Sequence, residues 1–275
     1  MIIDASFISY RSLYSFSHLG YKDGDDFVFT GIIYGFLKYI LDSVNRFITT
    51  TKVIVAWDSN PTYRKDIYPL YKNNRDKTKD PEFYQKYLRM RQQMKELEDY
   101  ILPSLGICQY VKEGYEADDV IATLAEQNTT NVIIGNDKDY FQLLDKAVLY
   151  NFNILRTIQW FRKEYGLEPE RWIDVQVLAG DKIDNIPGIN GIGIKTAVSL
   201  IRTYGNYQNF LDKNTNIVLP IKADISEKLV RLRRNLKLKC IKPDKDIETF
   251  KLILKKKQMF GLLGNITTFD SLSRR

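Results

Sequence analysis

The sequence is poor in the residues on which several large enzyme classes depend. Among 275 residues there is one histidine, His18, and there are two cysteines, Cys108 and Cys240. A single imidazole excludes zinc hydrolases with several histidine ligands and other chemistry that needs paired imidazoles. Two cysteines are too few for a disulfide scaffold or for a cysteine-based zinc finger. Any metal site in this chain must therefore use oxygen ligands.

Long apolar runs and a leader segment are also missing. The longest apolar stretch, residues 27–41, is interrupted by Lys38 and is too short to cross a bilayer. The chain begins with Met1-Ile-Ile-Asp4, without the basic and apolar leader of a secreted protein. With 44% hydrophobic and 27% charged residues, the composition is that of a globular protein. We expect a soluble, cytoplasmic protein that contacts no membrane.

Charge is distributed unevenly along the chain. The overall formal charge is +7, but residues 60–95 carry ten Lys or Arg against four Asp or Glu, and residues 221–257 carry thirteen against five. The rest of the chain is therefore acidic. This separation is typical of a protein that holds a polyanion against a carboxylate-lined site. Solvated helix faces would give the same pattern.

Aromatic residues interleave with the cations of the first basic segment. They are Tyr63, Tyr68, Tyr71, Phe83, Tyr84 and Tyr87. Aromatic faces among cations suit single-stranded DNA. On helices the same residues could equally be packing residues, so both interpretations stay open here.

Three short apolar runs are each followed by an aspartate. They are Ile2-Ile3 before Asp4, residues 53–57 before Asp58, and residues 132–134 before Asp137. Runs of this kind are typical of strands buried on both faces of a parallel sheet. Helical periodicity at 31–47 and 117–126 lies between them, which is the βαβ pattern. Ligand sites of such sheets lie beyond the carboxyl ends of the strands, so the three aspartates should face one crevice.

Further carboxylates are clustered more densely than helix capping requires. Glu116, Asp118 and Asp119 precede the second helical pattern, and Asp137 with Asp139 and Asp181 with Asp184 form two close pairs. Together with Asp4 and Asp58 this makes nine carboxylates, which would repel one another strongly without a cation. Hard oxygen ligands select Mg²⁺ or Mn²⁺, and two such ions are a common apparatus for attack on a phosphodiester.

A glycine-rich segment precedes a further predicted helix. Gly188, Gly191 and Gly193 allow tight turns and close approach to a ligand, and a helix is expected from about Lys195 to Gly205. Free backbone N–H groups at a helix start can bind a phosphate, with Lys195 and Thr196 adding contacts. The string from Ile186 to Ala197 looks like a helix-hairpin-helix, which binds the DNA backbone without reading its sequence.

Taken together and in this order, these strings resemble the 5′-nuclease family, which includes phage 5′→3′ exonucleases, flap endonucleases and the N-terminal nuclease domain of bacterial DNA polymerase I. The similarity covers about residues 1–240. The matching pieces are Asp4; Asp58 with Tyr63-Arg64; Tyr71-Lys72-Asn73-Asn74-Arg75; Glu116-Ala-Asp118-Asp119; Asp137-Lys-Asp139 with Gln142-Leu143; Gly180-Asp181-Lys-Ile-Asp184-Asn-Ile-Pro-Gly188; and a helix expected over 230–240 with Leu232-Arg233-Arg234-Asn235-Leu236.

The resemblance implies an α/β fold. It has a PIN-like parallel sheet core flanked by helices, with a helical arch and a helix-hairpin-helix DNA-binding region. We expect the nuclease core in residues 1–175, including an arch at about 60–110, and the helix-hairpin-helix and C-terminal helical region in residues 176–275. No polymerase domain follows, so a free-standing, phage-like enzyme is expected.

The resemblance also implies roles for individual residues. A first metal ion is expected on Asp4, Asp58, Glu116, Asp118, Asp119 and Asp137, and a second on Asp139, Asp181 and Asp184; both would be Mg²⁺ or Mn²⁺. Lys72 and Arg75 are the expected catalytic cations, which contact the scissile phosphate and stabilise charge in the transition state. The expected DNA-binding residues are Arg64, Gly188, Gly191, Gly193, Lys195 and Thr196, with K⁺ at the hairpin.

The implied activity is that of a 5′→3′ exonuclease and flap endonuclease in DNA replication or repair. Its substrates would be DNA with a 5′ flap, a nick or a free 5′ end, and its products would carry a 5′ phosphate. We expect a monomer in a bacterial or phage-infected cell, with a replication polymerase or single-strand-binding protein as partner. Two alternatives are an RNA-directed nuclease, such as one that removes RNA primers, and a decayed DNA-junction binding module. The second predicts missing carboxylates, and none is missing.

Overall fold

A six-stranded sheet forms the centre of the chain. The computed structural model describes residues 1–49, 52–75, 78–127, 131–241 and 243–272. The strand order is β5-β4-β1-β6-β7-β8, and all neighbours are parallel except β8, which is antiparallel to β7. The bounds are β1 Ile2–Asp4, β4 Ile54–Trp57, β5 Cys108–Val111, β6 Asn131–Ile134, β7 Ala147–Tyr150 and β8 Leu155–Arg156. The predicted α/β class with a largely parallel sheet is confirmed.

The central strands consist mainly of apolar residues because both of their faces are covered. Ile3 pairs in register with Val55 on one side and with Ile134 on the other, and these side chains belong to one hydrophobic cluster. Ile2 and Ile54 point to the opposite face and belong to a second cluster. Alternate residues of a strand point to opposite faces, so an uninterrupted apolar run is what a doubly covered strand requires.

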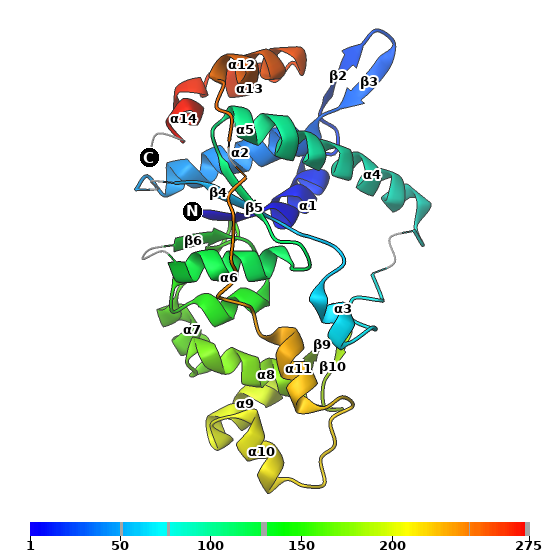
Figure 1. Cartoon of the computed structure of the whole chain (residues 1–275), viewed down its shortest axis with the longest axis vertical. Helices are drawn as coiled ribbons and strands as arrows, with labels where there is room; N and C mark the ends of the chain where they lie inside the picture. Colours follow the sequence, from blue (N-terminus) through cyan, green and yellow to red (C-terminus); the bar gives the residue numbers. More distant parts are fainter. Residues whose placement is uncertain (50–51, 76–77, 128–130, 242, 273–275) are drawn as a thin grey trace.

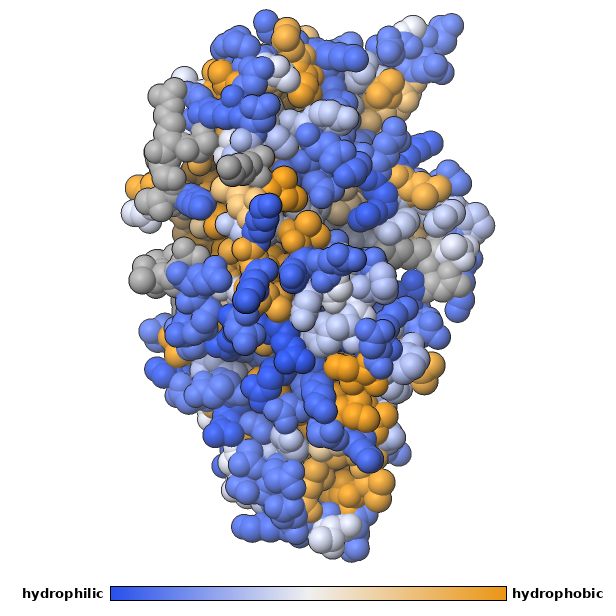
Figure 2. Space-filling model, in the orientation of Figure 1, coloured by the Kyte–Doolittle hydropathy of each residue, from blue (hydrophilic) through white to orange (hydrophobic). Residues whose placement is uncertain are grey.

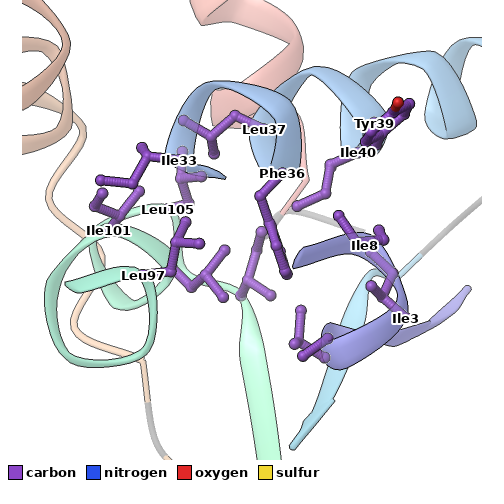
Figure 3. Close-up of a cluster of buried hydrophobic side chains, with 14 of the residues drawn as sticks. Ile3, Ile8, Ile33, Phe36, Leu37, Tyr39, Ile40, Leu97, Ile101 and Leu105 are labelled. Carbon is purple, nitrogen blue, oxygen red and sulfur yellow. The ribbon is translucent and has the colours of Figure 1, made fainter. Parts of the chain in front are cut away.

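The first helical layer covers one face of the sheet. It consists of α1 Ala5–Ser15, α2 Gly31–Arg46, α4 Pro81–Glu96, the π-helical turn η1 Leu97–Ile101 and α5 Leu102–Ser104. Figure 3 shows the centre of this cluster, where Phe36 of α2 faces Ile8 of α1 and Ile3 of β1. Each fully buried side chain of this size contributes about 1.5–3 kcal/mol. The hairpin of β2 Gly20–Asp23 and β3 Asp26–Phe29 projects from this layer (Figure 1).

The second layer covers the other face and continues into a helical region. It consists of α6 Ala117–Gln127, the 3₁₀ turns η2 Lys138–Leu143 and η3 Pro169–Arg171, α7 Ile158–Tyr165, α8 Trp172–Ala179, α9 Ile194–Tyr204, α10 Tyr207–Lys213 and α11 Ala223–Val230. Between α8 and α9 lies a small antiparallel pair, β9 Gly180–Asp181 and β10 Ile186–Pro187. The short helix α3 Tyr63–Ile67 contacts α11. In Figure 1 these helices form the lower half of an elongated molecule.

Three C-terminal helices return to the first layer. They are α12 Ile247–Lys256, α13 Phe260–Leu263 and α14 Ile266–Ser271. Phe250 and Phe269 are fully buried and pack edge to face with ring centroids 5.1 Å apart. They join the same hydrophobic cluster as α2 and α5, so the tail after Lys242 completes the core on that face (Figure 1).

Residues 231–241 form an extended segment that we call the strap. The predicted helix over 230–240 is wrong: α11 ends at Val230, and the strap runs across α6 to β5, where the Ile241 N–H donates to Gln109 O at 2.9 Å. Side chains of other elements bind its backbone in place of helical hydrogen bonds. The Arg233 N–H donates to Asp119 Oδ1 at 2.8 Å, and Thr123 Oγ1 accepts from the Leu236 N–H at 3.3 Å.

Within the described residues, no helix combines the length and the apolar character needed to cross a membrane. The predicted strands and the helices at 31–47 and 117–126 are confirmed, with ends that differ by at most one residue. Residues 60–110 contain α3, α4, η1 and α5. The division of the chain at residue 175 and the arch at about 60–110 stay predictions.

Candidate active site

The three strand-end aspartates lie at the carboxyl edge of the sheet, and each also caps a helix. Asp4 ends β1 and accepts the Phe7 N–H of α1 at 2.9 Å. Asp58 follows β4 and accepts the Ala117 N–H at the start of α6, also at 2.9 Å. Asp137 follows β6 and caps η2. Capping fixes each carboxylate relative to the sheet, so the capping role and the site role coexist.

A buried tyrosine connects the first of these aspartates to α6. The hydroxyl of Tyr140, in η2, lies 2.9 Å from Asp4 Oδ2 and 2.5 Å from Asp118 Oδ1. The side chain of Tyr140 is fully buried. A phenol has a single proton, so it can donate to only one of the two carboxylates at a time. One of the two carboxylates therefore receives no hydrogen bond from Tyr140, unless a carboxyl is protonated or a cation is bound.

Burial and mutual repulsion disfavour charge on these carboxyl groups. Burial raises the pKa of Asp4 from 3.8 to about 7, with the charge of Asp58 adding to the effect. The pKa of Asp118 is raised well above its ordinary value by burial and by the nearby charges of Asp137 and Asp4. Burial and the charge of Asp137 do the same to the pKa of Asp139. A cation placed among these groups would relieve both penalties.

A second group of carboxylates lies across a cleft of about 500 Å³. Asp137, Asp181 and Asp184 line the cleft, which reaches Gly193 and Ile194 at the start of α9. Asp181 Oδ1 accepts the N–H of residue 183 at 2.7 Å and that of Asp184 at 3.1 Å, which holds the loop after β9. The cleft thus joins the acidic edge of the sheet to the glycine-rich hairpin.

Both predicted catalytic cations lie among these carboxylates. Lys72 Nζ contacts Glu116 Oε1 and lies 3.5 Å from Asp184 Oδ2. Arg75 Nη2 contacts Asp184 Oδ1. Burial alone would lower the pKa of Lys72, but Glu116 and Asp184 hold it above its ordinary value, so Lys72 stays charged. A carboxylate just before α6 and one from the β9–β10 loop are thereby bound to cations from one turn.

The turn that carries these cations is fixed by the loop between β9 and β10. Lys72 has a positive φ of 54°, a conformation that is unfavourable for a side chain with a Cβ. Its N–H donates to Asp184 O at 2.9 Å. Asn74 Nδ2 donates to the carbonyl of residue 182 at 2.8 Å, and Asn185 Nδ2 donates to Leu70 O at 2.7 Å. The asparagines of the two motifs hold the segments together, and in the structure they do not face the cleft as ligands.

The structure contradicts the expected DNA contact of Arg64. Its side chain is only 2% exposed and binds Asp119 with both Nη1 and Nη2, at 2.6 and 2.9 Å. Nη1 also donates to Glu116 Oε2 at 3.0 Å, and Nε donates to Leu229 O at 2.8 Å. Four of the five N–H groups of this buried guanidinium thus donate inside the protein, so Arg64 is a structural residue here.

The same contacts remove Asp119 from the predicted metal ligands. Asp119 is fully buried, and its two oxygens accept three hydrogen bonds from Arg64 and the Arg233 N–H. Its function in this structure is to anchor α3 and the strap on α6. The remaining eight predicted carboxylates, those of Asp4, Asp58, Glu116, Asp118, Asp137, Asp139, Asp181 and Asp184, lie at the sheet edge or around the cleft.

Three polar residues of the site were not predicted as such. Tyr71 is 2% exposed, and its hydroxyl lies 2.8 Å from Glu116 Oε2 and 3.0 Å from Asp184 Oδ2, so it cannot stack on a base. Tyr140 bridges Asp4 and Asp118, and Gln176 Nε2 donates to Asp139 Oδ1. The signal available for Tyr140 was a hydroxyl directly after the Asp-Lys-Asp string. Gln176 gave none, because it lies in an apolar helix.

The glycines of the hairpin have different functions. A Cβ on Gly188 would lie 2.2–2.4 Å from the backbone of residues 179 and 180, so this glycine is required by packing, and its assignment to DNA binding stays a prediction. A Cβ on Gly191 or on Gly193 would meet nothing within 4 Å. Gly193 is the N-cap of α9 and makes no side-chain cap, and Lys195 and Thr196 are exposed in the first turn. The start of α9 is therefore open at Gly193, and its first N–H groups have no partner within the helix.

The donor set fits hard divalent cations. Among the described residues, no group of three or more Asp, Glu, His or Cys side chains is already arranged as a metal site. The reason is visible in the contacts: Tyr140, Gln176, Lys72 and Arg75 each occupy a carboxylate oxygen. Carboxylates whose charge is disfavoured by burial and mutual repulsion are suited to hold divalent metal ions.

Two protein-family models match the chain. The 5′-3′ exonuclease N-terminal resolvase-like domain matches residues 1–167, and the 5′-3′ exonuclease C-terminal SAM fold matches residues 167–258. The first match alone covers more than half of the 275 residues.

Individual relatives agree with these models. A 5′-3′ exonuclease of Buchnera aphidicola is 33% identical over 96% of both chains. Thermostable DNA polymerase I of Thermus thermophilus is 35% identical over 90% of this chain, but this chain spans only 29% of the polymerase. The fold is similar to that of a bacteriophage T5 flap endonuclease solved with DNA and metal ions, with a TM-score of 0.64 and 20% identity over 100% of this chain and 99% of that one. The chain belongs to the 5′-3′ exonuclease family.

Proposed function

We propose that the chain is a divalent-metal-dependent 5′ nuclease that hydrolyses DNA at 5′ flaps, nicks and free 5′ ends. The observation that carries the proposal is the position of Lys72 and Arg75 among the carboxylates of a cleft that continues to the open start of α9. Acidic groups for metal ions, cations for a phosphate and free N–H groups for a second phosphate thus lie along one surface. The names of the relatives, 5′-3′ exonucleases and a flap endonuclease, support the same reaction.

Eight carboxylates would hold two Mg²⁺ or Mn²⁺ ions. The first set is Asp4, Asp58, Glu116, Asp118 and Asp137, and the second is Asp139, Asp181 and Asp184. When bound, the ions would supply Lewis acidity and positive charge to the reacting phosphate group. The caps and hydrogen bonds described above hold the carboxylates for this purpose, and Tyr140 sets the spacing of Asp4 and Asp118.

Lys72 and Arg75 have two successive functions in this proposal. Without ions they neutralise Glu116 and Asp184. When the carboxylates are occupied by metal, the same cations become available for the phosphate oxygens of the scissile bond. Because the turn is fixed by Asn74 and Asn185, the cations move little between the two tasks, and they are positioned before the charge of the transition state develops.

The hairpin between α8 and α9 would hold a double-stranded arm of the substrate. Gly193, Lys195 and Thr196 present N–H groups and exposed side chains at the start of α9. These are contacts to the phosphate backbone, so they position DNA without selecting a sequence. K⁺ at this hairpin and protein partners in replication stay predictions.

The test uses three substrates labelled at both ends: a 5′-flap duplex, a nicked duplex and an RNA–DNA hybrid. Each is incubated with the protein in Mg²⁺ and in chelator. We expect 5′-phosphorylated products from the flap and the nick in Mg²⁺ alone. Faster cleavage of the RNA strand of the hybrid would establish the primer-removing alternative, and cleavage that persists in chelator would refute the proposed chemistry.

The matched variant is Asp137→Asn. It should abolish cleavage and leave binding of the flap unchanged or stronger, because a negative charge near the phosphate is lost. If the wild-type protein binds the flap without cleaving it, and Asp137→Asn binds it equally well, the chain is the DNA-junction binding module instead.

A further inference from the structure

Exposed and buried residues alternate along the strap. Its exposed positions are Arg231, Arg233, Asn235, Lys237 and Lys239, and the intervening side chains are buried or half-buried. From residue 228 to residue 243 the sequence contains no Asp or Glu. An extended segment with period-two alternation places its outward side chains in one line. The strap therefore presents a row of cations on one edge of the molecule.

The row is held rigidly. Its backbone is bound to α6 through Asp119 and Thr123 and to β5 through Gln109, as described above, and Thr123 Oγ1 also donates to Arg233 O at 3.1 Å. Inward residues anchor it further: Leu232 is 4% exposed in the second hydrophobic cluster. Cations on a fixed backbone lose less conformational entropy on binding than cations on a free tail.

The outer half of the row is not neutralised within the protein. Arg231 pairs with Glu227. Arg233 lies over the ring of Tyr63, 5.2 Å from its centroid. Lys237 and Lys239 have no acidic partner within 4 Å in the part of the chain that the structure describes. The charges of Lys237 and Lys239 are therefore available to an external anion.

The row begins beside the candidate active site. Tyr63, under Arg233, is the first residue of α3, and its neighbour Arg64 binds Glu116 of the site. From there the strap crosses α6 toward the edge strand β5 (Figure 1). Figure 2 shows hydrophilic residues running obliquely over this part of the front face, with hydrophobic residues on both sides. A long anion leaving the site in this direction would meet the cations in turn.

We infer that the strap binds the phosphate backbone of a double-stranded arm of the substrate, a contact separate from the hairpin at α9. This inference rests on the proposed nuclease function. Eight residue steps of extended chain separate Arg231 from Lys239, which is at most about 26–29 Å. That length corresponds to roughly eight base pairs at about 3.4 Å per step of a strand. The exposed positions hold no aromatic residue, whereas surfaces for single strands stack bases on aromatic rings.

The experiment compares two charge-matched double variants. Lys237→Ala with Lys239→Ala removes the outer half of the row, and Lys255→Ala with Lys256→Ala removes two exposed lysines of α12. Fluorescence anisotropy in chelator gives Kd for a blunt 30-base-pair duplex, the 5′-flap substrate and a single strand over a salt series. For the strap variant we expect duplex affinity roughly tenfold lower at 0.1 M salt, and a salt slope smaller by about 2. Single-strand binding should be unchanged.

The strap variant should cleave at the wild-type rate once the flap substrate is saturating, because it touches no residue of the site. Replacing both lysines by arginine should restore duplex binding, which shows that charge, and not folding, is responsible. An equal loss in the α12 variant, or a loss confined to single strands, would overturn the inference. If wild type fails to bind or cleave DNA at all, the proposed function fails instead. If wild type is active and the strap variant is indistinguishable from it, only the strap is wrong.

Discussion

The unfavourable backbone conformation of Lys72 determines where its ammonium group lies. Its positive φ of 54° is a conformation that costs of the order of 1–3 kcal/mol for a residue other than glycine. The hydrogen bond from its N–H to Asp184 and the ion pairs of its Nζ offset that cost. The conformation places the ammonium group between Glu116, just before α6, and Asp184 of the β9–β10 loop, where a phosphate approaching the cleft would meet it.

Lys72→Ala separates transition-state stabilisation from attraction of DNA. We expect the single-turnover rate at saturating flap substrate to fall by roughly a hundredfold, the scale for loss of one preorganised donor. Lys79→Ala is the control, since Lys79 is an exposed cation of the same basic segment, just before α4. It should weaken binding and reduce the salt slope by about one, with the saturated rate unchanged. A normal saturated rate in Lys72→Ala would place Lys72 outside the catalytic group.

Tyr140→Phe tests whether the buried hydroxyl positions the first metal site. Residues that orient metal ligands typically affect affinity by about 10- to 100-fold when removed. We therefore expect calorimetric titration with Mn²⁺ to show at least tenfold weaker binding, and the Mg²⁺ concentration for half-maximal cleavage to rise by a similar factor. At saturating Mg²⁺ the rate should recover to within about threefold.

Tyr39→Phe provides the matched control for this change. The Tyr39 hydroxyl is also part of a buried side chain, and it lies 3.1 Å from Ser15 Oγ, away from the carboxylates. The Tyr39→Phe variant should lower the temperature of the unfolding midpoint without changing the affinity for Mn²⁺. If both variants shift only the midpoint, Tyr140 is a packing residue.

Among the elements, the hairpin from α8 to α9 allows the sharpest substitution. Gly193→Val adds a side chain where nothing lies within 4 Å, at a φ of −91° that valine adopts freely. The fold should therefore be retained, while close approach of a phosphate to the start of α9 is blocked. We expect weaker binding of unrelated duplexes by equal factors in a filter-binding assay, and Ser199→Val on the exposed side of α9 should bind normally. Equal weakening for a single strand would contradict the assigned role.

Elements whose signal lies in consecutive residues could be predicted. The strands β1, β4 and β6 were predictable because doubly buried strands are apolar throughout, and their carboxyl ends identify the crevice at which Asp4, Asp58 and Asp137 lie. The cations of the Tyr-Lys-Asn-Asn-Arg string were found through the family resemblance, and the structure places them beside the predicted carboxylates.

Elements decided by distant partners could not be predicted. The strap contains strong helix formers such as Leu236 and Lys237, but its backbone groups are bound by Asp119 and Thr123, more than a hundred residues earlier. The same interaction uses Asp119 and Arg64, whose residue types suggested a metal ligand and a DNA contact. Residue type and local spacing carry no information about such a pairing, because it depends on the tertiary fold.

At the scale of the whole molecule, the acidic site should make stability depend on pH and on metal. The pKa of Asp4 is raised to about 7, and the pKa values of Asp118 and Asp139 are raised too. A carboxyl whose pKa is higher in the folded than in the unfolded protein contributes its full stabilisation at a pH below the unfolded-state pKa. That contribution is lost as the pH rises through the folded-state pKa. Glu116, whose pKa is lowered, loses its contribution only as the pH falls below about 4.5.

In chelator we therefore expect the free energy of unfolding to fall from pH 5 to pH 8, by up to about 1.4 kcal/mol per pH unit for each carboxyl that titrates. Saturating Mg²⁺ should flatten this dependence, because it binds only the folded, deprotonated site. Denaturant titrations at four pH values with and without Mg²⁺ measure both effects. A flat profile in chelator would show that the carboxylates are already compensated by Lys72 and Arg75.

The strap has a consequence for how the protein is made. A ribosome delivers the chain from its N-terminus, so Arg64 emerges 165 residues before Leu229, whose carbonyl its Nε binds. Asp119 likewise emerges 114 residues before Arg233, whose N–H donates to it. During translation the turn of Lys72 and Arg75 is therefore made before Leu229 and Arg233, which bind the neighbouring Arg64 and Asp119. The contacts that hold Arg64 and Asp119 are therefore complete only when the chain has been synthesised as far as the strap.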